Sequence, residues 1–221
     1  MAACESVRTI RVGNDDLSAR WQALLVVLQP ATEPRQPVCA ELIAAYQQPA
    51  RAYHNLDHLR YMFAIIDRLA SCTEDMHAVE LAAWFHDAVY DPRAHDNEEQ
   101  SAALAERRLR ELGLPPALIA QVCALILLTK SHQPASVDKN GQVLCDADLA
   151  ILGSENGYLE YAAAIRQEYS WVPEPDYRKG RAAVLESFLK RKHIYHTEII
   201  RLEREERARA NVQRELDRLR A

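Results

Sequence analysis

Glycine is scarce in this sequence, with only six among 221 residues. All-β folds with many hairpins depend on glycine for tight turns and for positive backbone dihedral angles. Alternating runs of β-branched residues are also few, so a sandwich or a barrel is a poor match to this chain. The shortage of glycine and of such runs therefore favours an all-α fold.

Cysteines are few and scattered. The five stand at positions 4, 39, 72, 123 and 145, and no two of them form a CxxC pair. An odd number without such a pair argues against a disulfide framework and against a zinc knuckle. A reducing cytoplasm is the simplest setting for these thiols, and we expect a cytoplasmic protein.

Long apolar runs and an excess of positive charge are absent too. No stretch approaches the roughly 18–20 apolar residues that a membrane span needs, and the N-terminus has no signal pattern, so we expect no membrane partner. A net charge of −5 provides no general attraction to nucleic acid, which is therefore not an expected partner. The sequence leaves open whether the chain forms a homo-oligomer.

Helical segments separated by prolines make up the rest of the pattern. Apolar residues recur at helical spacing, for example over residues 59–69. We expect one helical domain of about ten helices over residues 15–221, preceded by a loose tail over residues 1–14. Its last helix, about residues 195–219, is dense in Arg and Glu and should dock a thin apolar stripe on the core or on a partner.

One apolar stretch, Leu81–Tyr90, contains a histidine and an aspartate side by side, His86 and Asp87. The composition of this stretch predicts a helix buried on most sides. Burying an imidazole and a carboxylate costs several kcal/mol unless something compensates. The pair should therefore either satisfy itself by hydrogen bonds or share a bound metal ion.

Two more positions favour the metal ion. His58 ends the segment Tyr-His-Asn-Leu-Asp-His, and Asp148 lies in the segment Cys-Asp-Ala-Asp-Leu. A histidine, a His-Asp doublet and a distant aspartate resemble, in this order, the metal ligands of the HD superfamily of metal-dependent phosphohydrolases. The resemblance implies that His58, His86, Asp87 and Asp148 bind one divalent ion, which would be Mn, Zn, Co, Ni, Fe or Mg.

The first segment also resembles the Tyr-His-Asn-x-x-His stretch of cyclic-nucleotide phosphodiesterases, which share the HD core. By that resemblance His58 is a ligand and His54 is the general acid that protonates the leaving oxygen, with Asp87 as a further catalytic residue. His54 has an alternative role in capping a helix or bonding a neighbouring loop. The His-Glu-x-x-His helix of a zinc protease would need glutamate where this chain has Asn55, so the sequence does not match a zinc protease.

Asp146 competes with Asp148 for the role of fourth ligand. The resemblance favours Asp148, which matches an Ala-Asp-Leu helix start. Asp146 stands two residues earlier, about 200° round a helix, so the two are not expected to bind one ion. We expect Asp146 either at a helix start or as an acceptor for a ligand histidine.

Four residues are expected to bind the substrate. Lys130 and His132 follow an apolar helix, where HD proteins often place a histidine that lines the pocket or binds a second metal. Arg166 and Arg181 suit phosphate oxygens, which guanidinium binds bidentately, although internal salt bridges explain them equally well.

From about Trp21 to Asn211 the chain resembles a family of predicted HD phosphohydrolases of unassigned substrate. The resemblance implies a metal-dependent phosphohydrolase that cleaves a phosphoester of a small molecule, with a nucleotide as the leading class. Two rivals remain, a di-iron oxygenase and a non-catalytic protein that binds a metal or a nucleotide. The oxygenase would need further nitrogen donors for a second ion. His95 and His132, with Glu98 as a bridge, match that requirement poorly, so we expect a single ion.

Overall fold

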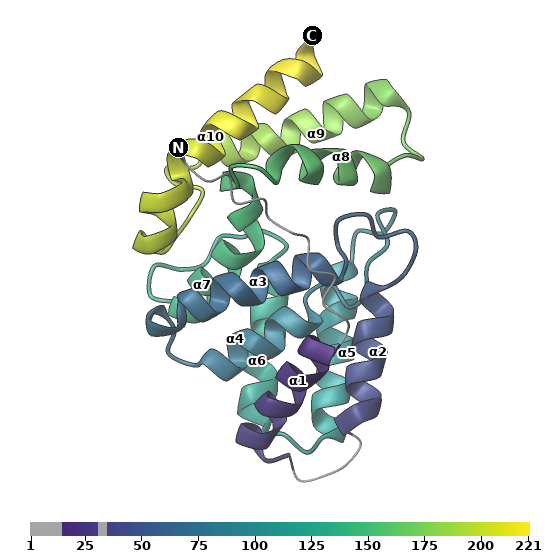
Figure 1. Ribbon diagram of the computed structural model, residues 1–221, viewed down its shortest axis with the longest axis vertical. Helices are drawn as coiled ribbons and strands as arrows, with labels where there is room; N and C mark the ends of the chain where they lie inside the picture. Colours follow the sequence, from purple (N-terminus) through teal and green to yellow (C-terminus); the bar gives the residue numbers. More distant parts are fainter. Residues whose placement is uncertain (1–14, 31–34) are drawn as a thin grey trace, which may run out of the picture.

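The computed structural model describes residues 15–30 and 35–221, and in these ranges it contains ten α-helices, two short 3₁₀ helices and no strand (Figure 1). The predicted all-α fold is confirmed. The tail predicted for residues 1–14 lies outside the described residues. In chain order the elements are α1 Asp15–Leu28, α2 Arg35–Tyr46, α3 Leu56–Arg68, η1 Ala70–Cys72, α4 Met76–Phe85, α5 Asn97–Glu111, α6 Pro116–Leu128, α7 Lys139–Leu149, η2 Ala150–Gly153, α8 Tyr158–Glu168, α9 Glu174–Leu189 and α10 Glu198–Arg220.

Helix α4 is the central helix of the core. All its residues from Ala78 to Phe85 are buried, and it packs against α3, α5, α6 and α7. Trp84 of α4 meets Trp21 of α1 edge to face, with ring centroids 5.3 Å apart. Such aromatic pairs dominate the apolar area of a core. The buried helix predicted from the apolar stretch is therefore present, and it delivers His86 and Asp87 to the interior.

Polar side chains define where the helices that carry the site begin. Asn55 accepts the backbone N–H of His58 at 3.3 Å and so starts α3. Asp75 caps α4 and Thr197 caps α10 in the same way. Each cap satisfies a helical N–H that has no partner inside its helix. These caps fix the registers of the helices.

Helix α7 begins earlier than the sequence suggested. The Asp138 carboxylate accepts the N–H of Gly141 at 2.8 Å and starts the helix at Lys139. Asp148 consequently lies in the last turn of α7, so the expectation of a helix start at Asp148 is wrong.

Helices α8, α9 and α10 lie together at the top of Figure 1. Glu215 of α10 joins them, because it accepts a hydrogen bond from Arg181 of α9 at 2.8 Å and one from Tyr158 of α8 at 2.5 Å. The charged last helix thus docks on its own chain through an apolar stripe that includes Ala208 and Val212. None of the described helices combines the length and apolarity needed to cross a membrane.

Candidate metal centre

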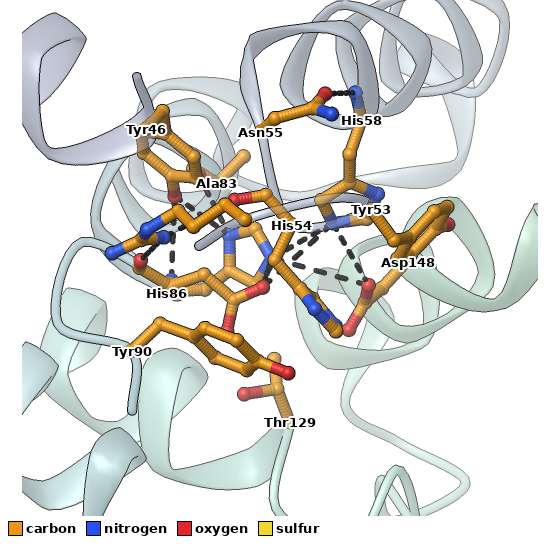
Figure 2. Close-up of polar contacts among 12 residues, drawn as sticks. Tyr46, Tyr53, His54, Asn55, His58, Ala83, His86, Tyr90, Thr129 and Asp148 are labelled. Carbon is orange, nitrogen blue, oxygen red and sulfur yellow. Dashed lines mark hydrogen bonds and ion pairs between the residues drawn. The ribbon is translucent and has the colours of Figure 1, made fainter. Parts of the chain in front are cut away.

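Three helices bring three donor atoms to one point. His58 lies in the first turn of α3, His86 directly follows α4, and Asp148 lies near the end of α7. The two histidine Nε2 atoms are 3.2 Å apart, and Asp148 Oδ1 lies 3.4 Å from the first and 3.9 Å from the second. Figure 2 shows these three side chains directed toward one another.

Asp87 adds a carboxylate to this group. Its Oδ2 lies 3.0 Å from Nε2 of His86 and 3.9 Å from Nε2 of His58. Donors that lie about 2.1 Å from one ion are separated by about 3.0–3.4 Å in octahedral or tetrahedral geometry. The separations of the two histidines from each other and from the two carboxylates run from 3.0 to 3.9 Å. His58, His86 and Asp148 all lie within 4.8 Å of one another and could hold a metal ion, and Asp87 lies beside this group next to the histidines.

His86 is oriented by its other ring nitrogen. Nδ1 lies 2.9 Å from the carbonyl oxygen of Ala83, to which an N–H at this position donates. This bond directs Nε2 at the other donors, as outer-shell acceptors of metal-binding histidines do. Arg51, itself buried, holds the following turn by donating to the carbonyl oxygens of Asp87 at 2.5 Å and Ala88 at 3.1 Å.

His58 lacks such an acceptor. Its Nδ1 is buried without a hydrogen-bond partner, and its ring packs against Tyr53 with centroids 4.8 Å apart. Burial lowers the pKa of His58, which favours the neutral imidazole that a metal ion requires. Packing rather than a hydrogen bond therefore sets the orientation of this ring.

The other three donors, His86, Asp87 and Asp148, influence one another's protonation. Burial opposes a charge on His86, but the carboxylates of Asp87 and Asp148 raise its pKa to about 9. Burial would raise the pKa of both carboxyl groups, yet the neighbouring histidines hold each pKa well below its ordinary value. The carboxylates are therefore ionised at neutral pH, and a bound cation would take the place of the proton on His86.

His54 stands beside the donor group and is held by Glu168. Its Nδ1 lies 2.7 Å from Oε2 of Glu168, and the backbone N–H groups of Tyr53 and His54 donate to Oε1 of the same carboxylate. Tyr90 donates a further hydrogen bond to Oε2 at 2.8 Å. Burial disfavours a charged His54, but Asp87 and Glu168 raise its pKa above the ordinary value. The surroundings of His54 therefore favour the protonated ring more than water does, and Glu168 occupies its Nδ1.

A cavity of about 510 Å³ opens next to the donors, with His54, Asp87 and Asp148 in its wall. Clefts of this size hold small organic molecules. The cations Lys130 and Arg191 also line the cavity, which suits an anionic ligand.

Two of the four predicted substrate residues line this cavity. Lys130 does so while pairing with Glu99 at 2.5 Å, and His132 does so with its Nε2 2.8 Å from Oδ2 of Asp148. The rim also holds His95 and Glu98.

The other two predicted substrate residues lie elsewhere, and their assignment needs correction. Arg166 pairs with Glu174 at 2.9 Å and donates to the carbonyl oxygen of Tyr169 at 2.8 Å. Arg181 is buried, and its guanidinium is occupied by Glu215. Neither lines the cavity, and each is paired with a carboxylate elsewhere, Arg166 with Glu174 and Arg181 with Glu215.

Asp146 also has a different role from the one expected. Its Oδ1 accepts the backbone N–H of His196 at 2.7 Å, and its Oδ2 accepts the N–H and the hydroxyl of Thr197 at 2.7 and 2.6 Å. It therefore anchors the start of α10, rather than serving as a helix-start residue or supporting a ligand histidine. Burial outweighs these bonds and raises its pKa to about 6.

Sequence reasoning missed several residues around the site, among them Arg51, Glu168 and Arg191. Glu168 lies 114 residues beyond His54, and Arg51 lies 36 residues before Asp87. No local pattern pairs residues over such separations, so the sequence carried no signal for them.

The comparisons with known proteins do not extend this description. No family model matches the chain, and neither a curated protein nor a solved structure matches it. The resemblance to HD phosphohydrolases rests on the residues themselves.

Proposed function

We propose that the protein is a metal-dependent phosphohydrolase of the HD type that cleaves a phosphoester of a small molecule, with a nucleotide as the leading substrate class. One observation carries this proposal, namely the convergence of His58, His86 and Asp148, with Asp87 beside the histidines, next to a cavity lined by His54. Two neutral nitrogens and two carboxylates are a ligand set that suits Mn, Zn, Co, Ni or Fe.

A divalent ion at these four residues would supply a Lewis acid and lower the pKa of bound water toward neutrality. The chain's own residues provide the remaining chemistry. Asp87 and Asp148 stay ionised beside the histidines and so balance the added positive charge. Lys130 and Arg191, in the cavity wall, offer positive charge to the phosphate oxygens.

His54 is assigned the role of general acid. Glu168 keeps Nδ1 of His54 occupied at 2.7 Å and favours the charged ring, so Nε2 is the nitrogen that gives a proton to the departing oxygen. The buried Glu168 carboxylate also fixes the rotation of the ring. This is the arrangement that proton transfer to a leaving group requires.

The test is to load the purified chain with Mn²⁺, Co²⁺ or Zn²⁺ and to assay it against nucleotides, cyclic nucleotides and sugar phosphates. We expect one ion per chain and hydrolysis of at least one phosphoester. His54→Ala should keep the ion and lose about 10²–10⁴-fold in rate. Metal binding without turnover of any phosphoester would favour a metal-binding or nucleotide-binding protein, and two irons with oxygen uptake would favour the oxygenase.

Leaving groups test the role of His54 separately. A nitrophenyl phosphoester needs little protonation of its leaving oxygen, so His54→Ala should affect it much less than an alkyl phosphoester. Equal losses on both substrates would mean that His54 positions the substrate and does not protonate it.

A further inference from the structure

His132 adopts a backbone conformation that most residues avoid. Its φ is 50°, and it is one of only two non-glycine residues with positive φ among the described residues. The chain uses glycine for a similar conformation after α5, where Gly113 has a φ of 72°. A left-handed histidine at a candidate site is strain that the surrounding structure must hold in place.

Two distant side chains hold this turn. Arg191 donates to the carbonyl oxygens of His132 at 3.1 Å and Ser131 at 2.9 Å. The Nε2 of His196 lies 3.2 Å from the carbonyl oxygen of His132, within reach of an N–H donor. Both side chains lie about sixty residues further along the chain, so the turn is fixed by tertiary contacts.

The turn aims the His132 ring at Asp148. Nε2 of His132 lies 2.8 Å from Oδ2 of Asp148, while Oδ1 of the same carboxylate faces the two ligand histidines. The two carboxylate oxygens therefore have separate partners. A carboxylate held at one oxygen presents the other in a fixed direction.

These contacts form a closed circuit of hydrogen bonds that begins and ends on α7. Asp146 accepts the N–H of His196, His196 reaches the carbonyl of His132, and His132 reaches Asp148, two residues from Asp146. We propose that His132 is a positioning residue for Asp148, and that Arg191 and His196 hold it through the backbone of residues 131–132. The inference rests on the proposed metal site and goes beyond it, because it assigns the residues that set the affinity for the ion.

Co²⁺ binding without any substrate tests the inference, with the dissociation constant and the ligand-field spectrum as readouts. His132→Asn tolerates positive φ but is too short to keep the bond to Asp148, and Arg191→Gln removes the forked support of the turn. Each should weaken Co²⁺ binding about 10–100-fold, the usual effect of losing an outer-shell partner, and should shift the spectrum in the same direction. Lys192→Gln, an exposed neighbour that loses the same charge, should bind as the wild type does.

A double variant that combines His132→Asn with Arg191→Gln separates the positioning of Asp148 from a general effect of charge or stability. If Arg191 acts through His132, the double variant should bind Co²⁺ no more weakly than His132→Asn alone, whereas independent effects would multiply. Circular dichroism confirms that each variant is folded before titration. A variant that fails this check is replaced by His196→Gln, which should weaken binding in the same direction.

The outcomes distinguish this inference from the proposed function. A wild-type chain that binds no Co²⁺ overturns the metal site and the inference together. Wild-type binding with unchanged affinity in folded Arg191→Gln overturns only the inference, and so do multiplicative losses in the double variant. Two ions per wild-type chain, one of which is lost in His132→Asn, would make His132 a ligand and would also overturn its positioning role.

Discussion

At the scale of single residues, Asp146 and Asp148 have different partners although they are two positions apart. Asp148→Ala should lose most of the bound metal, by more than about 100-fold in affinity, because a direct ligand matters more than an outer partner. Asp146→Asn should retain one ion per chain in excess metal, since the side chain contacts residues 196–197 and not the donors. Elemental analysis of both variants gives the answer. Full metal retention in Asp148→Ala would move the fourth ligand elsewhere.

Together with Asp87, Glu168 favours the charged form of His54, and its removal should be visible in the pH profile. The carboxylate raises the pKa of His54, so Glu168→Gln should lower that pKa and move the alkaline limb of kcat to lower pH. A general acid is active only while protonated, so the variant should lose most activity on the alkaline side and least at acidic pH. A uniform loss at every pH would indicate that Glu168 acts on folding or on metal binding instead.

His86 links metal binding to pH. The carboxylates of Asp87 and Asp148 raise its pKa to about 9, so the ion must displace its proton at neutral pH. The loss of this one proton from His86 should make the apparent affinity for the metal ion rise about tenfold per pH unit between pH 7 and 9, with about one proton released per ion bound. Calorimetric titration in two buffers of different ionisation enthalpy counts that proton. Affinity that is flat over this range would contradict a protonated His86.

At the scale of elements, the last three helices depend on one buried carboxylate. Glu215 of α10 bonds to Arg181 of α9 at 2.8 Å and to Tyr158 of α8. Glu215→Ala leaves the Arg181 charge buried without its partner and should cost about 3–5 kcal/mol of unfolding free energy. Glu203→Ala, which removes the exposed pair with Arg68, should cost less than about 1 kcal/mol. Chemical denaturation of the two variants compares them directly.

The candidate metal site also depends on several elements. α3, α4 and α7 supply the donors, the end of α8 supplies Glu168, and the segment after α9 supplies Arg191 and His196. The last part of the chain therefore contributes to the site without providing a ligand. A truncation before α8 would leave the four donors in the chain but remove the supports of His54 and His132.

At the scale of the whole molecule, metal binding should stabilise the fold. A ligand that binds only the native state at about 100 times its dissociation constant adds about 2.7 kcal/mol. For a chain of this size that is a rise of about 5–10 °C in Tm, and chelation should reverse it. Differential scanning calorimetry with Mn²⁺ or Zn²⁺ measures the shift, and Asp148→Ala is the control that should show little or none.

Sequence patterns anticipated the elements better than the contacts between them. The apolar stretch around Trp84 predicted the buried helix, and its doublet predicted where two donors enter the interior. The cap of α3 is local in the same way, because Asn55 bonds to backbone N–H groups two and three residues further along. The Ala-Asp-Leu pattern misplaced the start of α7, because the capping residue Asp138 lies ten residues before Asp148.

By itself the sequence determined the all-α fold and the central helix, since these follow from helical periodicity and burial, and it singled out His58, His86 and Asp148, which the structure brings together. Only the tertiary structure decided which partners those residues meet. It placed Glu168 within hydrogen-bond distance of His54, Glu215 within that distance of Arg181, and the start of α10 within that distance of Asp146. The physical reason is range, because periodicity and capping act within a few residues, whereas a buried charge takes whichever partner the packing of distant helices brings within about 3 Å.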